Sequence, residues 1–169
     1  MIPENDKRPK VTIHLDPVLE AYCRYIFKTP TNQDEIVINR KLREGKAIYS
    51  KVLPVEFPKR RPFCDNPVTF ILPLTRSNQS YLKYRFYDVN KTGEEQIADD
   101  LEVLMDKWTL RIFERGYSWG FKQEQIVNGI LRLLNVRKNS INFETVKKFD
   151  YRNRRRKEEE RIKLLLEAS

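Results

Sequence analysis

Several features that common enzyme and membrane-protein classes require are scarce in this chain. Its 169 residues include only five glycines, two cysteines and one histidine. None of the glycines lies in a GxxxxGK[ST] or GxGxxG motif, so nucleotide binding has no support, and no cofactor is predicted. A single histidine, His14, excludes most Ser–His catalytic pairs and histidine-based metal sites. No apolar run approaches about 18 residues, so we expect no membrane-spanning segment.

The cysteines and the N-terminus favour a reducing compartment. Cys23 and Cys64 stand alone, without a CxxC motif or a Cys/His cluster. The N-terminal segment MIPENDKRPK is polar and no apolar stretch follows it, so we do not expect a secretory signal. We therefore expect a cytoplasmic protein, or a virion-associated one if a phage encodes it.

Positive charge is abundant, and its excess is concentrated in residues 108–157. This stretch holds 13 Lys and Arg against 4 Asp and Glu, a net charge of +9. Residues 1–107 hold 18 against 16, and the last twelve hold 2 against 4, so the rest of the chain sums to zero. A localised excess of this kind is typical of a surface that meets a polyanion.

The N-terminal part is predicted to begin with a strand and a helix. Apolar and polar residues alternate over Lys10–Leu15, the period of a strand. Asp16 and Pro17 then suit the N-cap and first position of a helix, which carries one apolar face. Residues 31–48 fit a second helix, but EIVIN within them fits a short strand equally well.

These elements resemble the ribbon-helix-helix DNA-binding family over about residues 10–45. The matching features are the strand Val11–Leu15, the helix Asp16–Lys28 and the polar TNQDEIV start of a second helix. In that family, two strands of a dimer lie in the major groove and their outward side chains read bases. The resemblance implies that the readers are the outward side chains of the strand, Lys10, Thr12 and His14. The chain departs from the family at Gly45, which is followed by a β-like region.

Residues 46–90 are predicted to form an antiparallel sheet of about three strands. Apolar side chains recur on one side of residues 49–57, and Tyr81–Val89 reads as a returning strand. Pro67–Leu72 is apolar and β-branched, which suits a central strand. Rings and cations alternate over residues 81–87, as they do either on a half-buried strand or on a stacking platform for unpaired bases.

The first helix of the C-terminal part is predicted to follow Lys91. Thr92 and Glu95 lie three residues apart, the spacing of a capping box. Apolar side chains then recur at spacings of three or four and predict an amphipathic helix that ends at Gly116. These side chains are Ile97, Leu101, Leu104, Trp108 and Ile112.

Two more helices are predicted after a turn at residues 117–120. One covers residues 122–136, and the other is capped by Ser140 or Asn142 and continues towards the end of the chain. The side chains expected to be buried are Ile126, Ile130, Leu133 and Leu134 on the former, and Val146 and Phe149 on the latter. The fold class is therefore α+β, with an α+β domain at residues 1–90 and a helical domain at residues 91–169.

The C-terminal helices favour a helix-turn-helix-like interface for nucleic acid. In such a module the last helix lies in the major groove and its flanks contact phosphates. Arginine suits both bidentate guanine contacts and phosphates. The candidate binding residues are Arg137, Lys138, Lys147, Lys148, Tyr151, Arg152, Arg154, Arg155, Arg156 and Lys157.

A second interpretation explains the same charges without a ligand. Arg154–Arg156 lie four residues before Glu158–Glu160, so i,i+4 ion pairs on an exposed helix account for them as well. The apolar tail, Ile162 and Leu164–Leu166, needs a partner. That partner is either the core of the same chain or a second copy, and we expect a homo-oligomer contact.

Together these patterns predict a non-enzymatic protein that binds nucleic acid, most readily duplex DNA. A small regulator or an accessory factor of replication or of a mobile element fits this description. The alternative is a structural or assembly subunit, for instance of a phage particle, whose basic helix docks to an acidic partner or to packaged nucleic acid. A small metal-dependent nuclease is a third option, for which Glu56, Lys59 and Asp65 are the only hint.

Overall fold

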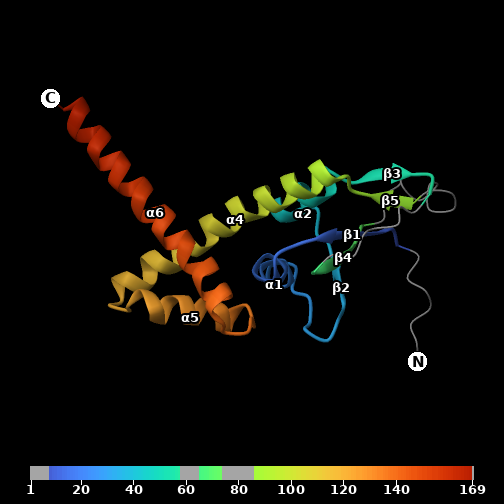
Figure 1. Cartoon of the computed structure of the whole chain (residues 1–169), viewed down its shortest axis with the longest axis horizontal. Coiled ribbons are helices and arrows are strands. Elements are labelled where there is room, and N and C mark those ends of the chain that lie inside the picture. Colours follow the sequence, from blue (N-terminus) through green and yellow to red (C-terminus); the bar gives the residue numbers. More distant parts are fainter. Residues whose placement is uncertain (1–7, 58–64, 74–85, 169) are drawn as a thin grey trace. The chain divides into compact units, whose positions relative to one another are not determined.

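The protein has an α+β fold, as the sequence predicts. The computed structural model describes residues 8–57, 65–73 and 86–168 (Figure 1). The chain forms two compact units, residues 1–104 and 105–169, and the division falls inside helix α4 (Lys91–Ser118). A compact unit is defined by contacts and a domain by independent folding, so the predicted domain boundary after residue 90 stays a prediction. No helix in the described ranges is both long and apolar enough to cross a bilayer.

The first unit contains a three-stranded mixed sheet in the order β1-β4-β2. The predicted strand at residues 10–15 is confirmed as β1 (Lys10–His14), and Pro67–Leu72 is confirmed as the central strand β4 (Pro67–Ile71). β1 pairs antiparallel with β4, whereas β2 (Glu35–Val37) pairs parallel with it. The expectation of a wholly antiparallel sheet is therefore wrong. The long connection over residues 38–66 leaves room for the crossover that a parallel pair requires.

A separate two-stranded ribbon joins β3 (Leu53–Val55) and β5 (Phe86–Asp88) in antiparallel register. The strand predicted at residues 49–57 is shorter because helix α2 (Arg43–Tyr49) extends to its first residue. Of the predicted ring-and-cation strand, residues 81–85 lie outside the described part of the chain, as does the nuclease candidate Lys59.

Helix α1 (Pro17–Ile26) begins where the sequence predicts, because the Asp16 carboxylate accepts a hydrogen bond from the Val18 amide at 2.8 Å. Its inner face includes Tyr22 and Cys23, both buried. The Tyr22 hydroxyl donates to Glu44 of α2 at 2.6 Å and so links the two helices. Burial, with Glu44 and Glu20 nearby, raises the pKa of the Cys23 thiol, and burial and the Glu44 hydrogen bond raise the pKa of Tyr22.

Because the pKa values of Cys23 and Tyr22 are raised, we expect the first unit to lose stability at alkaline pH. Both bind their protons more tightly in the folded chain than in the unfolded chain, where their pKa values are 9.0 and 10.0. Their contribution is therefore complete at neutral pH and is lost as the pH rises above about 9. We expect the free energy of unfolding to fall by about 2 kcal/mol between pH 8 and pH 10. Urea denaturation followed by circular dichroism measures this. Tyr22→Phe lacks one of the titrating groups and should show a smaller fall, and an equal fall would contradict the assignment.

Helix α4 starts and packs differently from the sequence expectation. Its first turn is capped by Asn90, whose side-chain oxygen accepts from the Gly93 amide at 2.7 Å, so the predicted Thr92–Glu95 capping box is wrong. Ile97 and Leu101 are buried as predicted, but the buried stripe then continues through Met105, Thr109 and Phe113 and not through Leu104, Trp108 and Ile112. Thr109 can be buried because its hydroxyl donates to the Asp106 carbonyl at 2.9 Å. Because threonine is polar, the spacing of apolar side chains in the sequence does not predict that Thr109 is buried.

Candidate nucleic-acid interface

The second unit places α5 (Gln123–Leu133) and α6 (Ser140–Glu167) after the end of α4 (Figure 1). α6 begins at Ser140 because the Asn139 side chain accepts from the Asn142 amide at 2.8 Å. The predicted caps, Ser140 and Asn142, are therefore wrong by one and three residues. The Asn142 side chain instead donates to the Arg137 carbonyl at 2.9 Å and fixes the turn between the two helices.

The buried faces of these helices largely follow the predicted spacing. Val146 and Phe149 are buried on α6, as predicted, and Leu133 of α5 is not, because it lies at the edge of the apolar face and is 48% exposed. The α5 segment buries Ile126, Val127, Ile130, Leu131 and Leu134. The buried face of α6 also carries three polar side chains: Asn142, Asp150 and Asn153.

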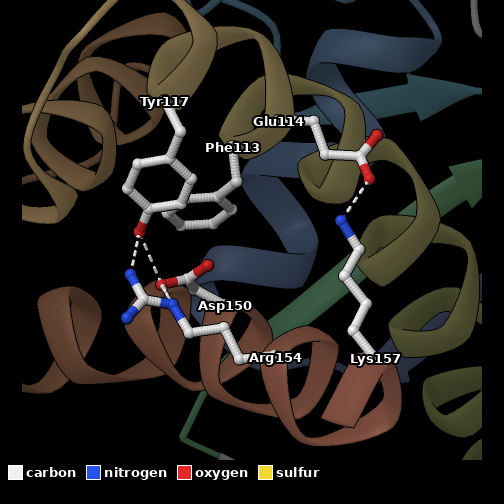
Figure 2. A pocket seen from close by; sticks show the side chains of 6 residues that line it. All are labelled: Phe113, Glu114, Tyr117, Asp150, Arg154 and Lys157. Atoms are coloured by element: carbon white, nitrogen blue, oxygen red, sulfur yellow. Dashed lines mark hydrogen bonds and ion pairs between the residues drawn. The ribbon is translucent and has the colours of Figure 1, made fainter. Parts of the chain in front are cut away.

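Asp150 is the centre of a polar cluster that joins three helices, and Figure 2 shows it with two of its partners, Tyr117 and Arg154. Its carboxylate accepts from the Tyr117 hydroxyl of α4 at 2.7 Å and from the Gln123 amide of α5 at 2.5 Å. Arg154, one turn further along α6, contacts the same carboxylate at 3.0 Å and donates to the Tyr117 oxygen at 2.5 Å. Burial raises the pKa of Tyr117, and the hydrogen bond to Tyr117 raises the pKa of Arg154, so the former stays neutral and the latter charged.

Two more of the predicted phosphate contacts pair with carboxylates of α4. Lys157 donates to Glu114 at 2.6 Å, and Arg156 pairs with Asp106 while also donating to Asn153. The side chains of Glu114 and Lys157 line a pocket of about 310 Å³ together with Phe113 and three members of the Asp150 cluster, Tyr117, Asp150 and Arg154 (Figure 2). Arg154, Arg156 and Lys157 therefore hold α6 on α4, and we call them the inner cations.

A different group of predicted residues lies on the surface, away from α4. Arg137 and Lys138 are exposed in the turn before α6, and Lys148 is exposed on the helix; none of the three forms an ion pair with another described residue. Tyr151 is 52% exposed on the same outer face. Arg155 is also exposed and, among the described residues, pairs only with Glu159, one turn away at 2.9 Å. These five residues are the outer set, and the spacing of Lys148, Tyr151 and Arg155 on α6 places those three opposite its buried face.

The two remaining candidates lie at the borders of that face. Lys147 pairs with Glu144 at 3.4 Å, and its ammonium lies 5.5 Å from the centre of the Tyr151 ring. Arg152 lies over the Phe149 ring at 5.9 Å. Of the three i,i+4 pairs that the sequence offers with Glu158–Glu160, only Arg155–Glu159 is formed in the described structure, because Arg154 and Arg156 turn towards other acids.

The residues that the ribbon-helix-helix resemblance implies as base readers lie in the first unit. Lys10 pairs with Glu35 at 2.8 Å, and the Thr12 hydroxyl shares a hydrogen bond with Thr69 at 2.8 Å. His14 is exposed. The second helix expected to start at TNQDEIV is not formed there, because residues 35–37 pair with β4. The role of the three side chains as readers stays a prediction.

The described part of the chain contains no cluster of three His, Cys, Asp or Glu side chains placed to hold a metal ion. No protein-family model, curated protein or solved structure matches this chain.

Proposed function

We propose that this protein binds duplex DNA, without catalysing a reaction, through the outer set of α6 and the turn before it. The observation that carries the proposal is the net charge of +9 over residues 108–157. The outer set supports it further, because Lys148, Tyr151 and Arg155 lie on one exposed face of α6 and Arg137 and Lys138 are exposed in the turn before it. A small regulator, or an accessory factor of replication or of a mobile element, would need such a surface.

The geometry suits the major groove. That groove is about 12 Å wide and admits one α-helix. Tyr151 and Arg155 lie four residues apart on the outer face, where they would reach base edges. Arg137 and Lys138 precede the helix, where they would contact phosphates and fix its register. The inner cations serve the interface indirectly, because they hold α6 on α4 and leave the outer face uncovered.

The triple variant Arg137→Ala/Lys138→Ala/Lys148→Ala tests the proposal. Each lost phosphate contact should reduce the magnitude of the slope of log K against log salt by about 0.9. For the triple variant this magnitude should therefore be smaller by about 2.7. Affinity should fall for every duplex sequence alike, because phosphate contacts carry no sequence information. Fluorescence anisotropy with a random-sequence duplex across a salt series measures both quantities. Unchanged affinity and slope would refute the proposed surface.

An assembly subunit is the second candidate, and the end of α6 favours it. Ile162 and Leu164–Leu166 are between 51% and 73% exposed, and a group of exposed apolar side chains is typical of an interaction surface. Such a subunit would dock through this end to a partner, of which a second copy is the simplest, and would not need to bind free duplex. Failure of the unmodified protein to bind duplex at low salt would therefore favour assembly.

A further inference from the structure

A second row of cations lies on α4, outside every residue considered so far. Lys107, Arg111 and Arg115 recur every fourth residue, and all three are exposed. Four residues of α-helix rise about 6 Å, so the row presents charges at regular intervals along one face. None of the three forms an ion pair with another described residue. The neighbouring acid Glu114 is already paired with Lys157.

The row continues into two exposed aromatic rings. Trp119 lies four residues after Arg115 and is 70% exposed, and Phe121 is 47% exposed. The turn that carries them is fixed: the Trp119 amide donates to the Arg115 carbonyl at 3.1 Å, and the Phe121 amide donates to the Gly116 carbonyl at 3.0 Å. Gly120 between them has a φ of 81°, the left-handed region that glycine adopts without strain. The backbone that carries the rings therefore needs little ordering when a ligand arrives.

We propose that this face, Lys107–Arg111–Arg115 with Trp119 and Phe121, binds single-stranded nucleic acid. Binders of single strands combine cations that follow the backbone with rings on which unpaired bases stack. A duplex has its bases already stacked, so it would leave the two rings uncovered and is not the ligand that this face fits. An acidic peptide would likewise leave the rings without stacking partners. The proposal does not depend on duplex binding by the outer set, because the two groups share no residue.

Trp119 is itself the probe for the first test. The protein contains two tryptophans, Trp108 and Trp119, and a base stacked on Trp119 quenches its fluorescence. We expect quenching by a 15-nucleotide oligothymidylate or oligouridylate and none by inorganic polyphosphate, which carries the charge without bases. Trp119→Ala should abolish the quenching and weaken affinity on the order of tenfold, whereas Trp119→Phe should keep most of the affinity. Preference for the DNA or the RNA oligomer would identify the natural ligand, and both outcomes support the site.

The second test compares two triple variants that each remove three positive charges. Lys107→Ala/Arg111→Ala/Arg115→Ala should reduce the salt slope for the single strand by about 2 and leave the slope for duplex unchanged. Arg137→Ala/Lys138→Ala/Lys148→Ala should reduce the salt slope for duplex and leave the slope for the single strand unchanged. All six side chains are exposed, so both variants should keep the wild-type circular dichroism spectrum. If both variants lost the same salt slope for the single strand and for the duplex, only net charge would matter, and the proposal would be overturned. Absence of single-strand binding at low salt would overturn it as well.

Discussion

Replacing Asp150 by alanine is expected to lower the free energy of unfolding of residues 105–169 by about 3 kcal/mol. The Asp150 side chain is 3% exposed and receives hydrogen bonds from Tyr117 and Gln123 and an ion pair from Arg154. Hydrogen bonds to a charged group each contribute about 1.5 to 3 kcal/mol. The loss is less than their sum, because Arg154 is half exposed and regains water once the carboxylate is gone.

Glu114→Gln provides the matched control for this variant. The Glu114–Lys157 ion pair also joins α4 to α6, at 2.6 Å, but its side chains are 50% and 53% exposed. Exposed pairs contribute about 1 kcal/mol or less. Urea denaturation followed by circular dichroism should therefore separate the two variants by about 2 kcal/mol. Equal, small losses would mean that apolar packing alone, and not the Asp150 cluster, holds α6 in place.

The second large effect is expected at Gly45 in α2. A Cβ atom at this position would lie 2.0 Å from the carbonyl oxygen of Asn39 and 2.7 Å from its carbonyl carbon. Both are backbone atoms, which cannot rotate away as a flexible side chain can. Alanine favours a helix over glycine by about 1 kcal/mol. The overlap outweighs this gain, and we expect Gly45→Ala to destabilise the first unit by about 2 to 3 kcal/mol.

Gly129→Ala is the control variant, and its expected change in stability has the opposite sign. Gly129 is an exposed residue of α5, and a Cβ atom there would meet no atom within 4 Å. Only the helix preference remains, so this variant should stabilise the second unit by about 0.5 to 1 kcal/mol. Thermal and urea unfolding of both variants measure the difference. A gain of stability in Gly45→Ala would show that α2 does not approach Asn39 as closely as described.

Local signals in the sequence predict the elements whose structure is decided locally. The alternation in Lys10–Leu15 and the Asp16 cap predict β1 and the start of α1, because each depends on neighbouring residues. The parallel pairing of β2 could not be predicted in this way, because three residues, Glu35–Val37, carry too short a period to exclude a helix. Their strand conformation depends on β4, more than 30 residues later.

In the candidate interface, too, local features could be predicted from the sequence, whereas contacts with distant residues could not. Net charge locates the basic region, but it does not say which cations are neutralised by distant acids. Arg156 and its partner Asp106 are 50 residues apart, and Lys157 and Glu114 are 43 residues apart. The burial of Asp150 had one usable signal: it lies four residues after the buried Val146 and next to Phe149, on the inner face of α6. From the sequence alone, a carboxylate at such a position is predicted to face water, because its partners on other helices are not known.

The length of α6 has a consequence for anything that binds its end. The helix covers Ser140–Glu167, yet every residue from 154 to 168 is exposed. A helical segment of fewer than about 12 to 15 residues is marginal in water without packing. A partner that covered Ile162 and Leu164–Leu166 would therefore add order to these final turns. Part of the intrinsic binding free energy of such a partner is used to hold these turns helical, so its measured affinity is weaker than the contact area alone implies.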